Sequence, residues 1–180
     1  EAARAAAEYL IRSGHRKIGI VCGSAVSEAG LIGSKRVDSA ITAFKENKIP
    51  FDKRKQFVPG KFSLEDGYNG TIKLLDRYPE VTAIYAVSDV VAIGALRAIN
   101  DRNLKVPQDI SIIGNDGIDF ARYVTPRLAT VEQDASQLAK RSVDDLLLRL
   151  NYNKPVIHEI IPFHVLAGES VSIKKPVEEK

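Results

Sequence analysis

The sequence predicts an α/β fold, a doubly wound parallel sheet that carries helices on both faces. Three observations predict it. Short apolar runs, such as KIGIVC at residues 17–22 and AIYAV at residues 83–87, alternate along the chain with longer segments of helical periodicity. These runs are apolar throughout, which is typical of strands buried on both faces. With 180 residues, 44% of them apolar, the chain can enclose the core of one domain.

The first quarter of the chain begins this alternation. Residues 1–13 have helical composition, and Gly14 can end that helix because glycine tolerates the left-handed conformation. The strand at residues 17–22 comes next, followed by a loop at residues 23–33 that contains three glycines. Residues 34–48 again have helical periodicity.

The middle of the chain repeats the pattern. Residues 56–58 predict a brief strand, and Ser63 can cap a helix that extends to about Arg77. After the strand at residues 83–87, Ser88 caps a further helix whose apolar residues recur at helical spacing.

The last third contains two more predicted strands, at residues 109–114 and 128–131. Asp134 caps a strongly amphipathic helix that ends at Leu150. Residues 156–166 predict a long final strand, and the residues after position 170 predict a loose tail.

The composition points away from several classes of protein. The net charge of +3 is mild and the charges are interspersed, so nothing in this chain predicts a nucleic-acid surface. Cys22 is the only cysteine, which excludes an internal disulfide and fits a cytoplasmic location. No apolar stretch is long enough to span a bilayer, so no membrane partner is expected. Because Glu1 lies inside a helical pattern, we expect the chain to be part of a longer protein.

No catalytic residue, metal site or cofactor is expected. His158 and His164 lie six residues apart on the last predicted strand and would share a face. We interpret them as surface or interface residues, because a metal ion would need a third ligand. Cys22 has no evident base beside it, and the glycines at residues 23–33 lack the spacing of a dinucleotide-binding loop. The sequence therefore does not predict an enzyme.

Four stretches resemble the lactose/galactose-repressor (LacI/GalR) family of transcription regulators, in order and over nearly the whole chain. They are EYLIRSGHRKIGIVCGS, SKRVDSAITAFKENKI, AIYAVSDVVAIGALRAINDRNLKVPQDISIIGNDG and YVTPRLATVEQDASQLAKRSVDDLL. The third is the most distinctive, because it resembles the family pattern through two strands, a helix and the loops between them.

The resemblance implies a type I periplasmic-binding-protein-like fold, in which two lobes are joined by three crossings. Residues 1–131 would be the C-terminal lobe of the effector-binding domain, residues 132–163 would belong to the N-terminal lobe, and residues 164–180 would form the return strand and tail. The helix at residues 134–150 would then lack its usual packing partner. A helix-turn-helix DNA-binding domain would lie outside this chain.

The resemblance also implies a ligand site at the carboxyl ends of the strands, where parallel sheets bind ligands. Arg36 aligns with an arginine that binds sugar hydroxyls or a carboxylate, although a solvated arginine at a helix start is the alternative. Asp116 would accept hydrogen bonds from sugar hydroxyls, or else form an Asx turn before Gly117. Phe62 would stack on a sugar ring, or else pack as an ordinary core aromatic.

Four further positions are predicted ligand contacts. Ser88 and Asp89 replace the Asn-Asp pair that is common in the family, and Ser88 would also act as a helix cap. Asn115 stands where the family usually has phenylalanine or tyrosine, which predicts a more polar pocket. Gln133 lies at the second crossing, where it could reach the cleft.

The implied function is that of a repressor whose sugar effector changes the closure of the lobes and so its affinity for operator DNA. A homodimer is expected, with residues 89–102 and 118–125 at its interface. Three alternatives remain: a sugar-binding protein of an ABC transporter, a doubly wound enzyme, and a catabolite regulator that responds to a phosphorylated carrier protein.

Overall fold

The computed structural model describes residues 1–23, 32–152, 155 and 158–174. Its helices are α1 (Ala2–Arg12), α2 (Ile32–Glu46), α3 (Lys53–Gln56), α4 (Leu64–Arg77), α5 (Asp89–Asp101), the 3-10 turn η1 (Asp119–Arg122) and α6 (Ala135–Tyr152). Its strands are β1 (Ile18–Val21), β2 (Phe57–Val58), β3 (Ala83–Ala86), β4 (Ser111–Ile113), β5 (Thr130–Gln133) and β6 (Phe163–Leu166). The loop predicted at residues 23–33 lies, apart from its ends, outside the described residues.

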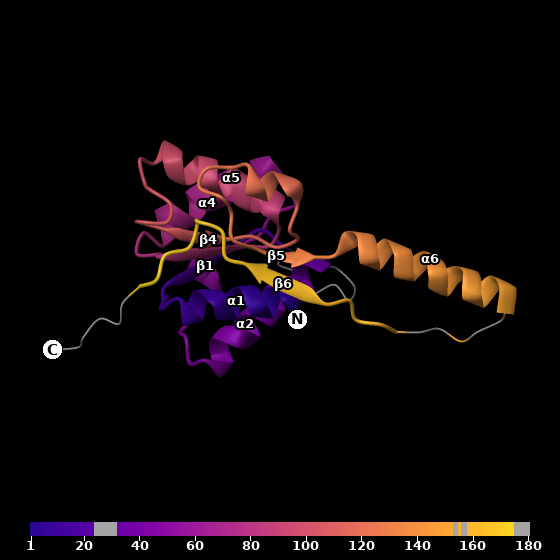
Figure 1. Cartoon of the computed structure of the whole chain (residues 1–180). Helices are drawn as coiled ribbons and strands as arrows, with labels where there is room; N and C mark the ends of the chain where they lie inside the picture. Colours follow the sequence, from indigo (N-terminus) through magenta and orange to yellow (C-terminus); the bar gives the residue numbers. More distant parts are fainter. Residues whose placement is uncertain (24–31, 153–154, 156–157, 175–180) are drawn as a thin grey trace.

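Four strands form one parallel sheet in the order β2-β1-β3-β4, with helices against both faces (Figure 1). In the register, Ile20 lies between Phe57 and Tyr85, and Tyr85 lies beside Ile113. All residues of these strands are buried, which is why their sequences are apolar apart from Ser111. The predicted fold class is confirmed.

The two faces of the sheet carry different helices. A Cβ atom built on Gly19 would lie 2.5 Å from Cδ2 of Leu74, so this residue of β1 faces α4. Because side chains alternate along a strand, Ile20 and its neighbour Tyr85 point to the opposite face. The helices α1 and α2 cover that face, while α4 and α5 lie on the other side of the sheet (Figure 1). Tyr85 therefore points toward the layer that contains α2.

The helices α4 and α5 pack closely at two glycines. A Cβ atom on Gly67 would lie 2.3 Å from the carbonyl oxygen of Val91, and one on Gly94 would lie 2.1 Å from that of Leu64. Real Cβ atoms do not approach backbone oxygens this closely, so the helix separation depends on both glycines.

Replacing Gly94 by alanine is therefore expected to destabilise the protein by about 1–3 kcal/mol, because the two helices must separate to admit the methyl group. The loss should outweigh the higher helix propensity of alanine. Urea unfolding would measure it. The variant Asn100→Ala, on the exposed side of the same helix, is the control and should lose no stability. Equal stability of the Gly94→Ala variant and the wild type would contradict the close packing.

The predicted final strand at residues 156–166 is wrong in its length. The strand β6 covers only Phe163–Leu166 and pairs antiparallel with β5 in a separate two-stranded sheet. Its partner ends at Gln133, because the Asp134 carboxylate accepts a hydrogen bond from the Gln137 N–H and starts α6. Beyond that point β6 has no strand to pair with.

The predicted shared face of His158 and His164 is wrong for the same reason. His164 lies on β6, whereas His158 lies in a segment with no secondary structure. Residues 156 and 157 lie outside the described residues.

The strand predicted at residues 56–58 begins one residue later than expected. Gln56 ends the short helix α3, which starts where the Asp52 carboxylate accepts a hydrogen bond from the Arg54 N–H. The Gln56 side chain is buried and donates to the Ile18 carbonyl, 2.8 Å away. A four-residue helix has no periodicity from which to predict it.

The tail predicted after position 170 is not loose where it is described. The Ile112 N–H donates to the Ser170 carbonyl at 2.8 Å, and the Ser170 hydroxyl donates to the Ile112 carbonyl at 2.6 Å. The Ser172 N–H donates to the Ser111 hydroxyl at 3.0 Å. These bonds cover the edge of β4, and two of the three use a serine hydroxyl, which an apolar pattern does not reveal. Residues 175–180 lie outside the described part.

His15 connects this tail to the body of the domain. It is buried, with Nδ1 3.1 Å from the Thr82 hydroxyl and Nε2 3.1 Å from the Ser172 carbonyl. Burial lowers the pKa of His15, and the charges of Lys174 and Arg16 lower it further, while the bond to Ser172 acts in the opposite direction.

A lowered pKa means that the folded protein favours the neutral imidazole. Its contribution to stability is then complete above the ordinary pKa of 6.5 and is lost as the pH falls below it toward the folded value. We expect the unfolding free energy of the wild type to fall more steeply below pH 6.5 than that of a His15→Gln variant. The control is Asn100→Gln, which changes an exposed residue without a titratable group and should leave the slope unchanged. Equal slopes for all three proteins would contradict the assignment.

The helix α6 extends away from the rest of the domain (Figure 1). None of its residues is buried, although it is amphipathic as predicted. Its exposed large apolar residues are Leu138, Val143, Leu146, Leu147, Leu148, Leu150 and Tyr152. Most of this apolar side is exposed, although residues 159–161 lie beside part of it, where Ile161 lines a hollow with Leu138 and Leu148.

Candidate functional site

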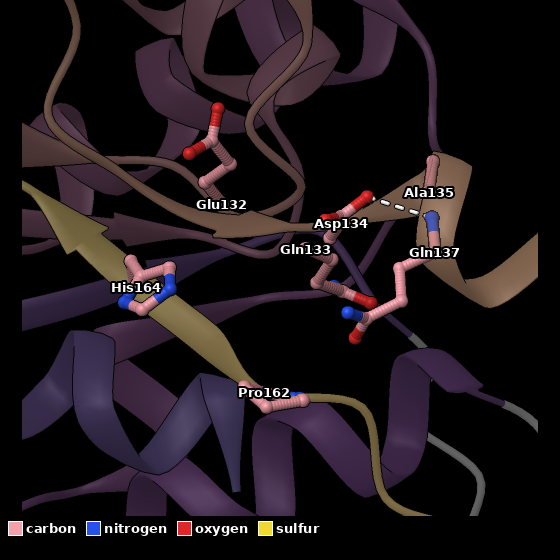
Figure 2. A pocket seen from close by; sticks show the side chains of 7 residues that line it. All are labelled: Glu132, Gln133, Asp134, Ala135, Gln137, Pro162 and His164. Carbon is pink, nitrogen blue, oxygen red and sulfur yellow. Dashed lines mark hydrogen bonds between the residues drawn. The ribbon is translucent and has the colours of Figure 1, made fainter.

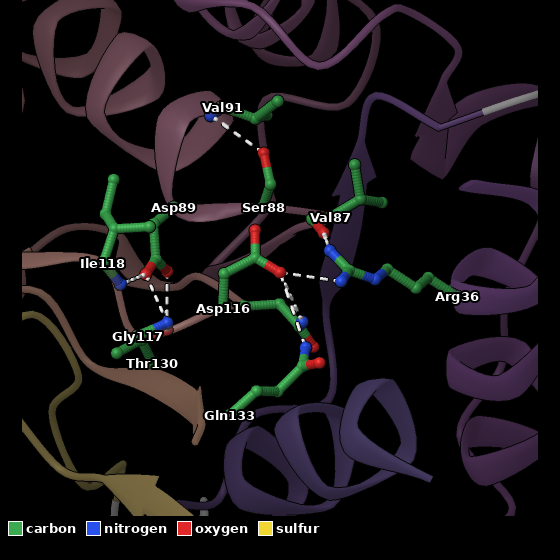
Figure 3. A network of polar contacts seen from close by, with 11 residues as sticks. Arg36, Val87, Ser88, Asp89, Val91, Asp116, Gly117, Ile118, Thr130 and Gln133 are labelled. Carbon is green, nitrogen blue, oxygen red and sulfur yellow. Dashed lines mark hydrogen bonds and ion pairs between the residues drawn. The ribbon is translucent and has the colours of Figure 1, made fainter. Parts of the chain in front are cut away.

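The carboxyl ends of the sheet strands carry a polar network (Figure 3). Arg36 reaches toward it from the second turn of α2. One guanidinium nitrogen donates to the Val87 carbonyl at 2.6 Å, and another forms an ion pair with Asp116 Oδ1 at 2.7 Å. Val87 follows β3 and Asp116 follows β4, so one arginine joins a helix to the ends of two neighbouring strands.

Asp116 is held in place by β5. Its N–H donates to the Val131 carbonyl at 2.9 Å, and its carbonyl accepts from the Gln133 N–H at 3.1 Å. Its φ of 139° is unusual for a residue with a side chain, and such backbone strain often occurs at functional sites. The next residue must be small, because a Cβ atom on Gly117 would lie 2.5 Å from the Glu132 Cα.

The Asp116 carboxylate uses its two oxygens differently. Oδ1 receives the Arg36 guanidinium and, more weakly, the side-chain amides of Asn115 at 3.3 Å and Gln133 at 3.5 Å. Oδ2 has no partner among the described residues. The Asp116 side chain is 32% exposed and that of Arg36 is 16% exposed. A free carboxylate oxygen beside a partly exposed guanidinium can bind a group that both donates and accepts hydrogen bonds.

Phe62 places an aromatic ring next to this pair. The Arg36 guanidinium carbon lies 5.8 Å from the ring centroid, within the range of a cation–π contact. Phe62 as a whole is 44% exposed, so it also has surface available for stacking. Its position is set by Ser63, whose hydroxyl caps α4 by accepting from the Asp66 N–H at 3.0 Å.

Ser88 and Asp89 lie below the surface rather than on it. Ser88 caps α5, where its hydroxyl accepts from the Val91 N–H at 3.3 Å. Asp89 is fully buried, and its carboxylate accepts from the N–H groups of Gly117 and Ile118 at 2.7 and 2.9 Å.

The hydroxyl of Thr130, on β5, also donates to the Asp89 carboxylate, at 2.5 Å. Burial raises the pKa of Asp89, while its three hydrogen bonds act in the opposite direction. These contacts give Asp89 the role of a support, because they join α5 and β5 to the loop that carries Asp116.

Asn115 is also fully buried. Its carbonyl accepts from the Asp89 N–H at 3.0 Å and its side-chain amide points to Asp116 Oδ1, so it lies beneath the site.

Tyr85 also belongs to this site, although no sequence motif predicts it. It lies beside Ile113 in the sheet and two residues before Val87, which Arg36 contacts, so it is close to the network. Burial raises the pKa of its hydroxyl. A tyrosine in an otherwise aliphatic strand is the one signal that could have indicated it.

A hollow of about 480 Å³ lies beside the network (Figure 2). It is lined by Glu132, Gln133, Asp134, Ala135, Gln137, Pro162 and His164. Because Gln133 also reaches Asp116, the hollow continues the site toward the start of α6. Within the described ranges, no group of three or more histidine, cysteine, aspartate or glutamate residues could hold a metal ion. None of the helices described is long and apolar enough to cross a membrane.

Residues 7–171 match a family model described as a periplasmic binding protein-like domain. The chain is 37% identical over 174 residues to the ribose operon repressor of Haemophilus influenzae, an alignment that covers 94% of this chain and 50% of the repressor. It is 39% identical over 168 residues to the HTH-type transcriptional repressor PurR of Proteus mirabilis, covering 93% and 48% of the two chains. The chain thus spans about half the length of the curated relatives it matches.

Solved structures agree with these relatives. A LacI family transcriptional regulator from Enterococcus faecium with bound ribose superposes with a TM-score of 0.83 at 28% identity, covering 97% of this chain and 63% of that protein. All three of these proteins are transcription regulators.

Proposed function

Because the chain belongs to the LacI/GalR family, as a periplasmic binding protein-like effector domain, we propose that it is the sensing region of a bacterial DNA-binding repressor. The effector we propose is a sugar, bound in a cleft between two lobes. No enzymatic role is proposed, and a cytoplasmic location fits this function.

The observation that carries the proposal is the Arg36–Asp116 pair at the carboxyl edge of the sheet. Sugars present several hydroxyl groups, each of which donates and accepts a hydrogen bond. A carboxylate accepts from them, a guanidinium donates to them, and the exposed ring of Phe62 can cover an apolar face of the sugar. The ribose held by the Enterococcus faecium regulator supports this class of ligand.

We assign direct contacts to Arg36, Phe62, Asp116 and Gln133, because these side chains are at least partly exposed. Ser88, Asp89 and Asn115 remain predicted site residues. We assign them to the layer beneath the contacts, since all three are buried.

The division of the chain follows from the same proposal. Residues 1–131 form the C-terminal lobe of the effector domain, residues 132–163 contribute to the N-terminal lobe, and residues 164–180 form the return strand and tail. The antiparallel pairing of β5 with β6 supports crossings at this point, and the bare apolar side of α6 supports a partner lobe in the longer protein.

Signal transmission would use a homodimer. Effector binding would change the closure of the lobes and, through it, the placement of two DNA-binding domains on operator DNA. We place part of the dimer interface on α5 and on residues 118–125, where Phe120 and Tyr123 are largely exposed.

Isothermal titration of the full-length protein against pentoses, hexoses, hexuronates and disaccharides tests the proposal. We expect one class to bind and to change the affinity for operator DNA. Binding of a phosphorylated carrier protein, with no response to any of these sugars, would contradict it.

A further inference from the structure

Two buried polar atoms beneath the proposed sugar site lack hydrogen-bond partners. They are the Tyr85 hydroxyl and the side-chain carbonyl oxygen of Asn115, and neither has a partner among the residues that the structure describes. Both residues are 0% exposed. An unsatisfied buried polar atom costs about 1–3 kcal/mol, so natural proteins rarely leave one unpaired.

The sheet register brings these two side chains to the same face. Tyr85 lies beside Ile113 in the parallel pairing of β3 and β4. Asn115 continues the extended path of β4, because the N–H groups of Gly114 and Asp116, on either side of it, both donate to the segment that contains β5. Side chains two residues apart in an extended strand point the same way, so Asn115 shares a face with Ile113 and Tyr85.

That face is the one covered by α2, which also carries Arg36. Tyr85 lies on β3 two residues before Val87, whose carbonyl accepts a hydrogen bond from Arg36, so Tyr85 belongs to the end of the strand that carries the proposed contacts. The other end of the Asn115 side chain donates to Asp116.

The chemistry of the pair selects its occupant. A buried phenol donates, whereas the Asn115 carbonyl oxygen can only accept. An anion could not donate to Asn115 and would face Asp116 and Asp89, and an ammonium group could not accept from Tyr85. A hydroxyl oxygen does both.

We propose that Tyr85 and Asn115 form a second contact point of the effector site, which takes one hydroxyl oxygen from the sugar or from a water molecule held under it. This inference rests on the proposed sugar site and adds a specificity element to it. The affinity for the sugar then depends on the Tyr85 hydroxyl even though that group is buried.

Titration of the full-length protein with the tightest sugar of the panel, and with its monodeoxy analogues, tests the proposal. The variant Tyr85→Phe should bind that sugar about 3- to 10-fold more weakly, the equivalent of one neutral hydrogen bond. The variant Tyr78→Phe, which removes a partly buried phenol at the end of α4, is the control and should bind like the wild type. If the sugar supplies the oxygen, one deoxy analogue should lose affinity for the wild type but not for Tyr85→Phe. If water supplies it, no analogue should show this difference.

Unchanged affinity of Tyr85→Phe, in an experiment where Arg36→Ala loses binding, would overturn the inference and leave the proposed function intact. Failure of the wild type to bind any sugar would count against the proposed function instead. In that case a high-resolution crystal structure of the full-length protein without a sugar tests the Tyr85–Asn115 contact point separately from the proposed function. It should show an oxygen atom within hydrogen-bond distance of both Tyr85 Oη and Asn115 Oδ1, and no such atom would overturn it.

Discussion

Replacing Asp116 by asparagine is expected to weaken sugar binding by the full-length protein about 10- to 100-fold. The Asp116 Oδ2 atom is a free charged acceptor at the proposed site, and a hydrogen bond to a charged group contributes about 1.5–3 kcal/mol. Replacing Arg36 by alanine should weaken sugar binding by a similar factor, because it removes the donor side of the same contact. Isothermal titration measures both.

The exposed pair of Arg102 and Asp76, 2.6 Å apart, supplies matched controls. Asp76→Asn and Arg102→Ala change the same residue types outside the proposed site and should bind the sugar like the wild type. The affinity of the double variant at Arg36 and Asp116 should fall by less than the product of the two single fold-losses, because each single variant already disrupts the shared contact. Affinities within twofold of the wild type for both single variants would refute the site.

Replacing Asp89 by alanine is expected to lower the free energy of unfolding by about 2–4 kcal/mol. The change removes three short hydrogen bonds to a buried carboxylate and leaves the N–H groups of Gly117 and Ile118 without their acceptor. Part of this loss is recovered because the carboxylate no longer has to be desolvated, the effect that raises its pKa. The total free energy of unfolding of a domain of this size is typically only about 5–15 kcal/mol.

Urea unfolding followed by circular dichroism would measure the effect. The control is Asp119→Ala, an exposed residue of the same loop, which should change stability by no more than about 0.5 kcal/mol. The unfolding free energy of Asp89→Asn should lie between those of Asp89→Ala and Asp119→Ala, because asparagine keeps one acceptor but turns an N–H₂ group toward donors. If Asp89→Ala were as stable as the control, the Asp89 carboxylate would not be what joins α5 and β5 to the loop that carries Asp116.

The architecture could be predicted because it depends on local signals. Apolar runs without alternation identified the buried strands, and the capping residues Ser63, Ser88 and Asp134 each accept the hydrogen bond expected at a helix start. The rule that parallel sheets bind ligands at their carboxyl edge directed attention to Asp116, and the family resemblance directed it to Arg36. The structure brings the two side chains to 2.7 Å, and their contact with a ligand stays a prediction.

The remaining features depend on tertiary partners that no local pattern encodes. The strand β6 begins at Phe163 because its partner there, Gln133, is the last residue of β5. Residues 170–172 are held against the edge of β4 by hydrogen bonds that include serine hydroxyls. Asp89 next to a helix cap is equally compatible with a ligand contact and with a buried support, and only its three partners distinguish them. Tyr85 looks like any core aromatic until its hydroxyl is found unpaired.

A crystal structure of the full-length protein with its sugar bound would show whether the Arg36–Asp116 pair forms the binding site. We expect sugar hydroxyls within hydrogen-bond distance of Asp116 and Arg36, with the ring of Phe62 against the sugar. A sugar bound elsewhere, with the Arg36–Asp116 ion pair unchanged and covered by protein, would contradict this expectation.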